Sequence, residues 1–183
     1  MKLLTLNLIA AVCRNMGIGY KGSIPWNLKN EIAYFGKITT STSKPGVNNI
    51  VIMGRKTWLS IPPQSRPLKN RINIVLSQTE KKIAGAHHTA KSVDAAIYLI
   101  KENEIVHEHI FIIGGERVYK EAIESNHCQK FYLTRIDGDF DCDTFFPAFN
   151  SDCYELVDEP GVDSRVQLEN GLRYKYEVYV KKG

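Results

Sequence analysis

Cysteine is scarce in this sequence of 183 residues, and the four cysteines have no metal-binding spacing. Cys13, Cys128, Cys142 and Cys153 form no C-x-x-C pair and no tight cluster with histidine, which argues against a zinc site. Four cysteines are also too few to staple a chain of this length. We therefore expect reduced thiols, no bound metal and a cytoplasmic location.

The chain also lacks a hydrophobic run long enough to span a membrane. The best candidate, residues 3–12, is about ten residues long and contains Asn7, whereas a membrane helix needs about 20 apolar residues. One lysine precedes this run and Cys13 follows it, so the segment could be mistaken for a lipoprotein signal. Val12 is a poor residue before a lipidated cysteine. A buried strand is the better interpretation, and we expect no membrane association.

Acidic residues are almost absent from the first half of the chain. Residues 1–91 carry 14 lysines and arginines but only two acids, Glu31 and Glu80, whereas residues 92–183 carry 10 basic and 18 acidic residues. The net charge of +4 hides this division. A basic half indicates an anionic partner, and a carboxylate within that half requires a reason.

The sequence has no repeats, no low-complexity tract and no Pro/Ser-rich linker, so residues 1–183 are expected to form a single domain. Short apolar runs rich in Ile, Val and Leu predict buried strands, and the stretches between them predict helices. The predicted strands are residues 3–12, 49–53, 71–76 and 109–113, and the predicted helices are residues 28–39, 56–61, 93–102 and 116–124. This alternation predicts an α/β fold with a mostly parallel sheet.

The C-terminal part has a different pattern. After a strand at residues 130–135, two more strands are predicted at 154–157 and 172–180 with no helix between them. In the last strand Tyr174 and Tyr176 alternate with charged residues, which is typical of a strand with one buried face. We therefore expect an antiparallel C-terminal edge on the parallel sheet.

Residues 17–22 match the G-x-G-x-x-G pattern of dinucleotide-binding turns and follow a predicted strand. That pattern requires a helix to begin at the last glycine and an acid about 20 residues further on. Pro25 and a Thr/Ser tract at residues 39–43 occupy these places, so we reject this interpretation. A flexible loop that folds over a ligand fits better, and a plain surface turn is the alternative.

Further polar turns stand at the ends of predicted strands. Gly54-Arg55-Lys56-Thr57 begins a helix, where free backbone N–H groups and two cations favour an anion. Gly114-Gly115 precedes another helix, and Leu76-Ser77-Gln78 and Lys91 offer hydroxyls and a lysine nearby. Ligands of parallel sheets bind beyond the carboxyl ends of the strands. One ligand with several phosphates is therefore a plausible occupant, and solvated turns are the alternative.

Glu31 lies on the first predicted helix beside an apolar stripe that contains Leu28, Ile32 and Phe35. A carboxylate in that position is costly to bury unless a partner satisfies it. One interpretation is a partly exposed helix residue. The other is a carboxylate that binds a cationic or amidine-like group of a ligand through two hydrogen bonds.

Three other polar features of the sequence have candidate roles. Arg71 enters a buried strand, where it is poor core material and suits a ligand carboxylate. The His87-His88 pair has no spaced partner and is expected at the surface. The alternating aspartates of residues 137–143 lack the glycine and the terminal glutamate of an EF-hand, so we expect a solvated acidic loop.

Together these segments resemble dihydrofolate reductase over nearly the whole chain, from Leu6 almost to the end. The matching segments, in order, are Met16-Gly17-Ile18-Gly19, Ile24-Pro25-Trp26, residues 51–58, Arg66-Pro67-Leu68, residues 112–118 and residues 143–147. Bacterial pterin and flavin-precursor reductases share the fold, but Trp26 with Glu31, together with Arg71, favours folate. The resemblance implies a central eight-stranded mixed sheet with about four flanking helices. It further implies NADPH-dependent reduction of 7,8-dihydrofolate to tetrahydrofolate, in one-carbon and thymidylate metabolism, by a monomer that binds antifolate inhibitors.

The resemblance assigns residues to the substrate. Glu31 would bind N3 and the 2-amino group of the pterin, with Thr134 as its hydrogen-bond partner and Trp26 as a water-holding neighbour, and these three are the expected catalytic residues. Arg71 would bind the glutamate α-carboxylate. The other expected substrate-binding residues are Ile9, Ala10, Ile32, Phe35, Ser60, Ile61, Leu68, Ile113 and Tyr119.

The resemblance also assigns an NADPH site to the glycine loop and the strand ends. The expected residues are Ala11, Ile18, Gly19, Gly22, Ser23, Gly54, Arg55, Lys56, Thr57, Leu76, Ser77, Gln78, Lys91, Gly114, Gly115, Glu116, Arg117, Val118 and Tyr119. Gln78 stands where many relatives have an arginine for the 2′-phosphate, which leaves Arg55, Ser77 and Lys91 to select NADPH. Cis peptide bonds are expected at Arg66-Pro67 and Gly114-Gly115.

Two other functions compete with this one. A basic nucleic-acid-binding module would explain the pI of about 8.8 and the basic half. Its cations, however, lie at strand ends and loops instead of along one helix or sheet face, so nucleic acid is not the expected partner. A catalytically inactive relative is disfavoured because Trp26, Glu31, Arg71 and Thr134 are all present.

Overall fold

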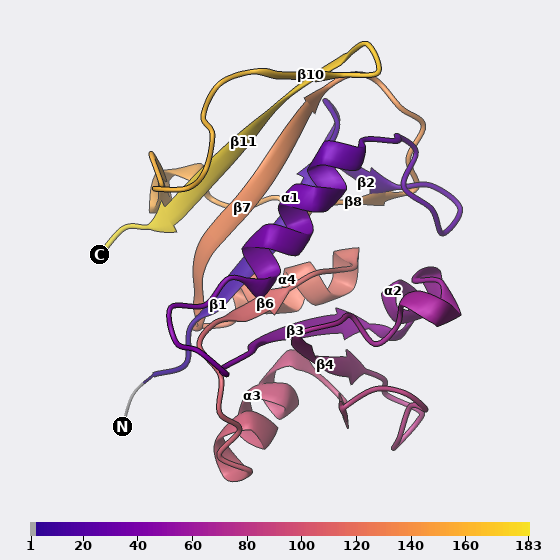
Figure 1. The fold of residues 1–183 in the computed structure, drawn as a ribbon, viewed down its shortest axis with the longest axis vertical. Helices are drawn as coiled ribbons and strands as arrows, with labels where there is room; N and C mark the ends of the chain where they lie inside the picture. The colour runs from indigo at the N-terminus through magenta and orange to yellow at the C-terminus, as the bar shows by residue number, and fades with distance from the viewer. Residues whose placement is uncertain (1–2) are drawn as a thin grey trace.

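The structure, a computed structural model, describes residues 3–183 as a central sheet covered by helices (Figure 1). The strands are β1 (Leu6–Val12), β2 (Gly17–Gly19), β3 (Asn49–Gly54), β4 (Arg71–Leu76), β5 (His88–Ala90), β6 (Ile110–Ile112), β7 (Cys128–Asp137), β8 (Thr144–Phe145), β9 (Tyr154–Val157), β10 (Gln167–Glu169) and β11 (Leu172–Lys181). The helices are α1 (Lys29–Thr40), α2 (Arg55–Ser60), α3 (Val93–Glu102) and α4 (Glu116–Glu124), with 3-10 turns at Pro63–Ser65 and Ser151–Cys153.

Within residues 3–183, the main sheet has the strand order β10-β11-β7-β1-β6-β3-β4-β5. β1 pairs in parallel with β6 and β7, and β3, β4 and β5 extend the parallel part. β11 pairs antiparallel with β7, and its two ends pair antiparallel with β10 and β9. The predicted α/β fold, with eight strands side by side in one mixed sheet and an antiparallel C-terminal edge, is confirmed. A further short strand, β9, pairs with one end of β11.

The alternation of side chains in β1 explains why its sequence is apolar throughout. Leu8 and Ala10 lie in a core that α3 and α4 cover, whereas Ile9 lies in a second core that contains Trp58 of α2 and contacts Phe35 of α1. Successive side chains of a strand point to opposite faces. A strand covered on both faces is therefore apolar at nearly every position.

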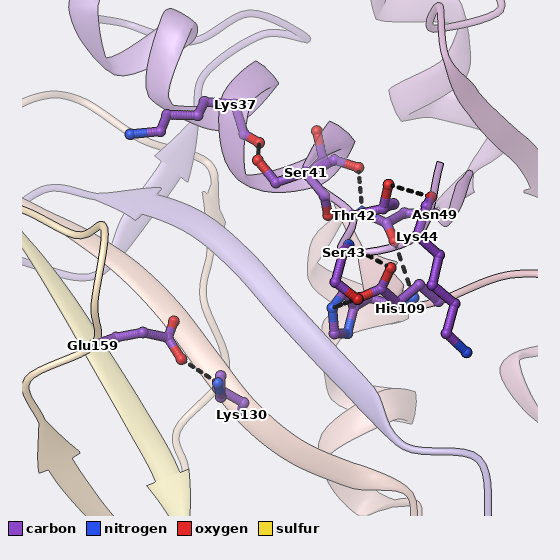
Figure 2. A network of polar contacts seen from close by, with 11 residues as sticks. Lys37, Ser41, Thr42, Ser43, Lys44, Asn49, His109, Lys130 and Glu159 are labelled. Atoms are coloured by element: carbon purple, nitrogen blue, oxygen red, sulfur yellow. Dashed lines mark hydrogen bonds and ion pairs between the residues drawn. The ribbon is translucent and has the colours of Figure 1, made fainter. Parts of the chain in front are cut away.

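A polar network fixes the C-terminal end of α1 to the sheet (Figure 2). The buried Asn49 side chain, at the start of β3, donates to the carbonyl oxygens of Thr39 (3.0 Å) and Ser41 (2.9 Å) and accepts from the His109 N–H (3.0 Å). The Ser41 hydroxyl also donates to the Lys37 carbonyl at 2.6 Å. Because buried polar groups are costly to leave unpaired, these bonds set where α1 lies on the sheet.

Several predicted boundaries move. The strand predicted from residue 3 begins at Leu6, whose N–H donates to the His127 carbonyl at 2.7 Å, while Leu3 is 59% exposed. The helices predicted at 28–39 and 56–61 occupy Lys29–Thr40 and Arg55–Ser60. The short strands β2, β5, β8 and β10 were not predicted, because two or three residues show no periodicity.

The glycine segment differs from its prediction as a flexible loop, since part of it is a strand. β2 pairs antiparallel with β8, and a Cβ on Gly17 would lie 2.3 Å from the Cys142 sulfur. Gly17 thus permits β2 to pack closely against the segment that leads into β8. Within this segment, Gly22, at φ +77°, is the glycine that uses the left-handed backbone region.

Candidate active site

Glu31 lies in the first turn of α1, and its Oε1 accepts a hydrogen bond from the Thr134 hydroxyl at 3.1 Å. Thr134 is buried in β7, beside the central strand β1. The N–H groups of Lys29 and Asn30 donate to the Glu169 carboxylate of β10, at 2.9 and 3.1 Å. A carboxylate distant in sequence therefore caps α1, and it fixes the turn that directs Glu31 toward the sheet.

The surroundings of Glu31 favour its neutral form more than water does. Burial raises the pKa of this carboxyl above its ordinary value, and the hydrogen bond from Thr134 opposes the rise. No lysine, arginine or histidine of residues 3–183 forms an ion pair with it. A carboxylate with a perturbed pKa and one neutral partner is a candidate for binding the donor groups of a ligand.

Trp26 lies just before α1 and is buried. Its ring packs edge-to-face on Phe140, with centroids 5.4 Å apart, in a cluster that also contains Leu28 and contacts Ala11. The indole is therefore fixed by its neighbours near the start of the helix that carries Glu31. The structure thus joins Glu31 to Thr134 by a hydrogen bond and places Trp26 in the segment directly before the helix that carries Glu31.

Many of the predicted substrate residues share one hydrophobic cluster. Ile9 lies within this core, and the partly buried members that pack against it include Phe35, Ile61, Leu68 and Ile113. Ala10 differs, because its side chain belongs to the core on the opposite face. Ile32, which is 60% exposed, and Ser60 face solvent. Five of the predicted residues therefore share one apolar cluster, while Ile32 and Ser60 are exposed and the Ala10 side chain lies on the other face of the sheet. Their role in substrate binding stays a prediction.

Arg71 is the first residue of β4 and is partly buried. Its Nη1 donates to the Thr39 hydroxyl at 3.0 Å and its Nε donates to the Lys69 carbonyl at 2.9 Å. Burial lowers the pKa of this guanidinium, and no carboxylate of the described residues pairs with it. A fixed cation without an acid suits a ligand carboxylate. Sequence reasoning missed Thr39, a fully buried hydroxyl near the end of α1.

Glycines bring two turns together at the carboxyl ends of β3 and β6. The Gly54 N–H donates to the Gly114 carbonyl at 2.8 Å. A Cβ on Gly54 would lie 3.2 Å from Val118, and one on Gly114 or Gly115 would lie 3.4 or 3.6 Å from the Thr57 hydroxyl. Side chains at these positions would fill the space between the turns, where nucleotides bind in parallel sheets.

The predicted phosphate-binding residues lie at the same edge of the sheet. Ser77 follows β4 and its N–H donates to the Ala90 carbonyl of β5 at 2.9 Å, so Lys91, the next residue, is close to it. Arg55 forms an ion pair with Glu80, with 2.8 Å between Nη2 and Oε1. Lys56, Gln78 and Lys91 are exposed. Glu80 was not a predicted site residue. Its position as one of two acids among the cations of residues 1–91 could have indicated a specific partner.

The residues of α4 lie in different environments. Tyr119 is buried, its hydroxyl donates to the Ile9 carbonyl at 2.7 Å, and burial raises the pKa of this phenol strongly. Glu116 accepts from a backbone N–H of β8 at 2.7 Å, which ties α4 to the small sheet. Val118 is buried and Arg117 is exposed. Tyr119 and Glu116 therefore fix α4 in place.

The predicted closing loop, residues 18–23, is anchored to the segment before β8. The Gly19 carbonyl accepts from the Asp143 N–H at 2.9 Å, and Tyr20 and Ser23 exchange two backbone hydrogen bonds of 2.8 and 3.0 Å. Ile18 is partly buried, whereas Gly22 and Ser23 are exposed. The tip of the loop is exposed, and its Lys21 N–H donates to the Asp143 carboxylate at 2.9 Å.

Both expected cis peptide bonds are present, at Arg66-Pro67 and Gly114-Gly115. The Arg66 guanidinium donates to the carbonyls of Trp58 (3.2 Å), Leu59 (3.4 Å) and Ile61 (2.8 Å). Arg66 therefore caps the C-terminal end of α2.

Two polar clusters outside the site have partners that the sequence did not reveal. The aspartates of the acidic loop are exposed as predicted, and Arg14 pairs with two of them, Asp137 at 2.7 Å and Asp139 at 2.8 Å. His87 is exposed as predicted, but its Nδ1 accepts from the Asn73 N–H at 2.8 Å. Both clusters join segments far apart in sequence, which no local pattern predicts.

Comparisons with known proteins agree with the predicted family. The dihydrofolate reductase family matches residues 5–181 of this chain. The dihydrofolate reductases of Rattus norvegicus and Mus musculus are 49% and 50% identical to it over 182 residues, with 97% of each chain covered. The solved structure of Schistosoma mansoni dihydrofolate reductase, 39% identical, superposes with a TM-score of 0.87 over 99% of this chain and 100% of that one. The chain therefore belongs to the dihydrofolate reductase family.

Proposed function

We propose that this chain is an NADPH-dependent reductase that converts 7,8-dihydrofolate to tetrahydrofolate. The observation that carries this proposal is the partly buried Glu31 carboxyl, with its raised pKa and its bond to Thr134. Family membership supports the reaction and implies a nicotinamide cofactor in general. The choice of NADPH and the residue roles below are part of the proposal.

Glu31 binds the pterin ring in this proposal. Its two oxygens accept hydrogen bonds from the N3–H and the 2-amino group, a bidentate arrangement that fixes the orientation of the ring. Thr134 supports the ionised carboxylate and restrains its rotation. Glu31 polarises the pterin from a distance, and the proton for N5 arrives through water beside Trp26.

The other end of the substrate is held by Arg71 and the apolar wall. Arg71 binds the glutamate α-carboxylate, since Thr39 and Lys69 orient its guanidinium and no protein acid competes. Phe35, Ile61 and Leu68 pack against the rings between the two polar ends.

The turns at Gly54 and Gly114 fit a dinucleotide, because their backbones approach each other where a Cβ would fill the space. Arg55, Ser77 and Lys91 lie at the adjoining strand ends and would bind its phosphates. When bound, the nicotinamide group supplies the hydride that reduces pterin C6. Residues 18–23 exclude water from the closed site.

We propose one domain, residues 1–183, that works as a cytoplasmic monomer and binds antifolate inhibitors. Cys13, Cys128, Cys142 and Cys153 are free thiols, which a reducing compartment maintains. Within residues 3–183, the helices are too short or too polar to cross a membrane.

A spectrophotometric assay tests the proposed function. Purified chain is mixed with NADPH, and absorbance at 340 nm is followed after 7,8-dihydrofolate is added. We expect a steady loss of absorbance that requires both NADPH and dihydrofolate. The loss should stop when an antifolate inhibitor is added in an amount equal to that of the protein. No loss, together with tight and salt-dependent binding of an oligonucleotide, would instead support a basic nucleic-acid-binding module.

A further inference from the structure

Glu80 stands directly against Arg55, one of the cations proposed for the cofactor. Its Oε1 lies 2.8 Å from Nη2 of Arg55, and the two side chains are 41% and 50% exposed. Between Glu31 and Asp94 the sequence contains no other acid. The only carboxylate of that stretch therefore neutralises this arginine.

The backbone of Glu80 is held in place by its turn. Its N–H donates to the Ser77 hydroxyl at 3.0 Å, and Ser77 is itself buried, with its N–H bonded to the Ala90 carbonyl at 2.9 Å. The turn after β4 is thus tied to β5, and it brings Glu80 to the first residue of α2.

An arginine and an acid have opposite preferences at a ribose. An arginine accommodates a 2′-phosphate, whereas a carboxylate accepts a hydrogen bond from a free 2′-hydroxyl. Here the two groups follow the ends of the neighbouring strands β3 and β4 and are paired with each other. A 2′-phosphate at Arg55 would have to displace Glu80 and would then lie beside its negative charge. A 2′-hydroxyl meets no such repulsion.

We propose that Glu80 sets cofactor choice by weakening the preference for a ribose 2′-phosphate, so that this chain uses NADH as well as NADPH. The inference rests on the proposed function, because it assumes that the nicotinamide cofactor binds at these strand ends. Glu80 acts through Arg55 on the phosphate and contacts the 2′-hydroxyl directly. It is a specificity residue with no part in hydride transfer.

The test is Glu80→Gln, which keeps the shape of the side chain and removes its charge. Binding of NADP⁺ and NAD⁺ to the variant and the unchanged chain is measured by isothermal titration calorimetry at low salt. Without the repulsion, the preference for NADP⁺ should rise about tenfold, by tighter NADP⁺ binding and weaker NAD⁺ binding. The KM values for NADPH and NADH should move in the same directions.

Two further variants make the result specific. Asp163→Asn removes a carboxylate from another surface ion pair, with Arg165 at 2.9 Å, and should leave the preference unchanged. In an Arg55→Gln background, Glu80→Gln should change NADP⁺ affinity by less than twofold, since the competition for Arg55 is gone.

Two results would overturn the inference. If the unchanged chain binds both nucleotides and Glu80→Gln leaves their affinity ratio within twofold, Glu80 does not set cofactor choice and the proposed function stands. If the unchanged chain binds neither nucleotide, the assumed cofactor site is wrong, and the proposed function falls with the inference.

Discussion

Glu31 and Glu80 are the two acids of the basic half, and their environments are opposite. Glu31 is partly buried, accepts one hydrogen bond from a neutral hydroxyl and has a raised pKa. Glu80 is 41% exposed and pairs with an arginine. We therefore expect these identical side chains to have different roles, because burial and the nature of the partner decide what each carboxylate can bind.

The comparison of the two glutamates suggests separate effects on turnover and on the choice of cofactor. A desolvated carboxylate makes strong hydrogen bonds to a ligand, whereas a carboxylate in water gains little from any single partner. We therefore expect substitutions at Glu31 to change turnover and substitutions at Glu80 to change only the choice of cofactor. The following predictions test this division, in order of decreasing effect.

The largest effect is expected for Glu31→Gln, which should lower kcat at pH 7 by about 10²- to 10⁴-fold. The amide cannot accept two hydrogen bonds from the pterin and no longer polarises it. Steady-state rates at 340 nm measure the loss, and circular dichroism checks that the fold is retained. Near-normal turnover would remove Glu31 from the proposed mechanism, and the surface variant Asp163→Asn, measured alongside, should retain the full kcat.

Thr134→Val should weaken dihydrofolate binding about tenfold at neutral pH, because it removes the hydrogen bond that supports the ionised Glu31. That bond lowers the pKa of Glu31, so its loss should raise the pKa further. As the solution is acidified, the variant should therefore lose dihydrofolate binding at a higher pH than the unchanged chain does. Fluorescence titrations from pH 5 to 9 measure both effects. Thr40→Val, whose hydroxyl donates within its own helix at 2.7 Å, is the matched control.

Glu31→Gln should also stabilise the free protein at pH 8, by about 1 kcal/mol. The pKa of Glu31 is higher in the folded protein than in the unfolded chain, where it is near 4.5. The carboxyl therefore makes its full contribution to stability below pH 4.5 and loses it as the pH rises through the folded pKa. The glutamine has no charge to desolvate, so the difference should vanish as the pH falls toward 4.5. Urea unfolding at several pH values measures it; equal stability at every pH would show that Glu31 is well solvated.

The smallest effect is expected for the stability of Glu80→Gln. An ion pair this exposed contributes about 0–1 kcal/mol and is screened by salt. The free energy of unfolding should therefore change by less than about 1 kcal/mol at low salt and not measurably at 0.5 M salt. A larger loss of unfolding free energy that does not depend on salt would mean that Glu80 has a structural role. The proposed difference between Glu80 and Glu31 would then no longer hold.

The fold was predictable where the physics is local. The run of β4 and the helix Val93–Glu102 were predicted with their observed bounds, because apolar composition and a Ser92 cap mark them in the sequence. The N-terminal cap of α1 was not, since Glu169 comes from β10 at the opposite end of the chain. Periodicity reports on an element itself, whereas caps and short edge strands depend on the folded neighbours.

The site shows the same limit. Glu31, Thr134 and Arg71 were identified through a family resemblance, and the position of Glu31 beside an apolar stripe was independent support. The position of the Ala10 side chain could have been derived from the sequence, because neighbouring residues of a strand, here Ile9 and Ala10, point to opposite faces of the sheet. The contact between Arg55 and Glu80 could not, because 25 residues of chain separate its partners and the turn at Ser77 determines where they meet.

The central position of β1 has a consequence for the order in which this chain acquires structure. Its partners come from β6 and β7: Asn7 lies opposite Phe111, and Leu6 lies opposite Cys128. During synthesis at about 5–20 residues per second, β1 therefore waits roughly ten seconds before either neighbour exists. When they arrive, two strands from the acidic half enclose one from the basic half. Attraction between the halves then favours this late, long-range pairing, which contact order alone makes slow.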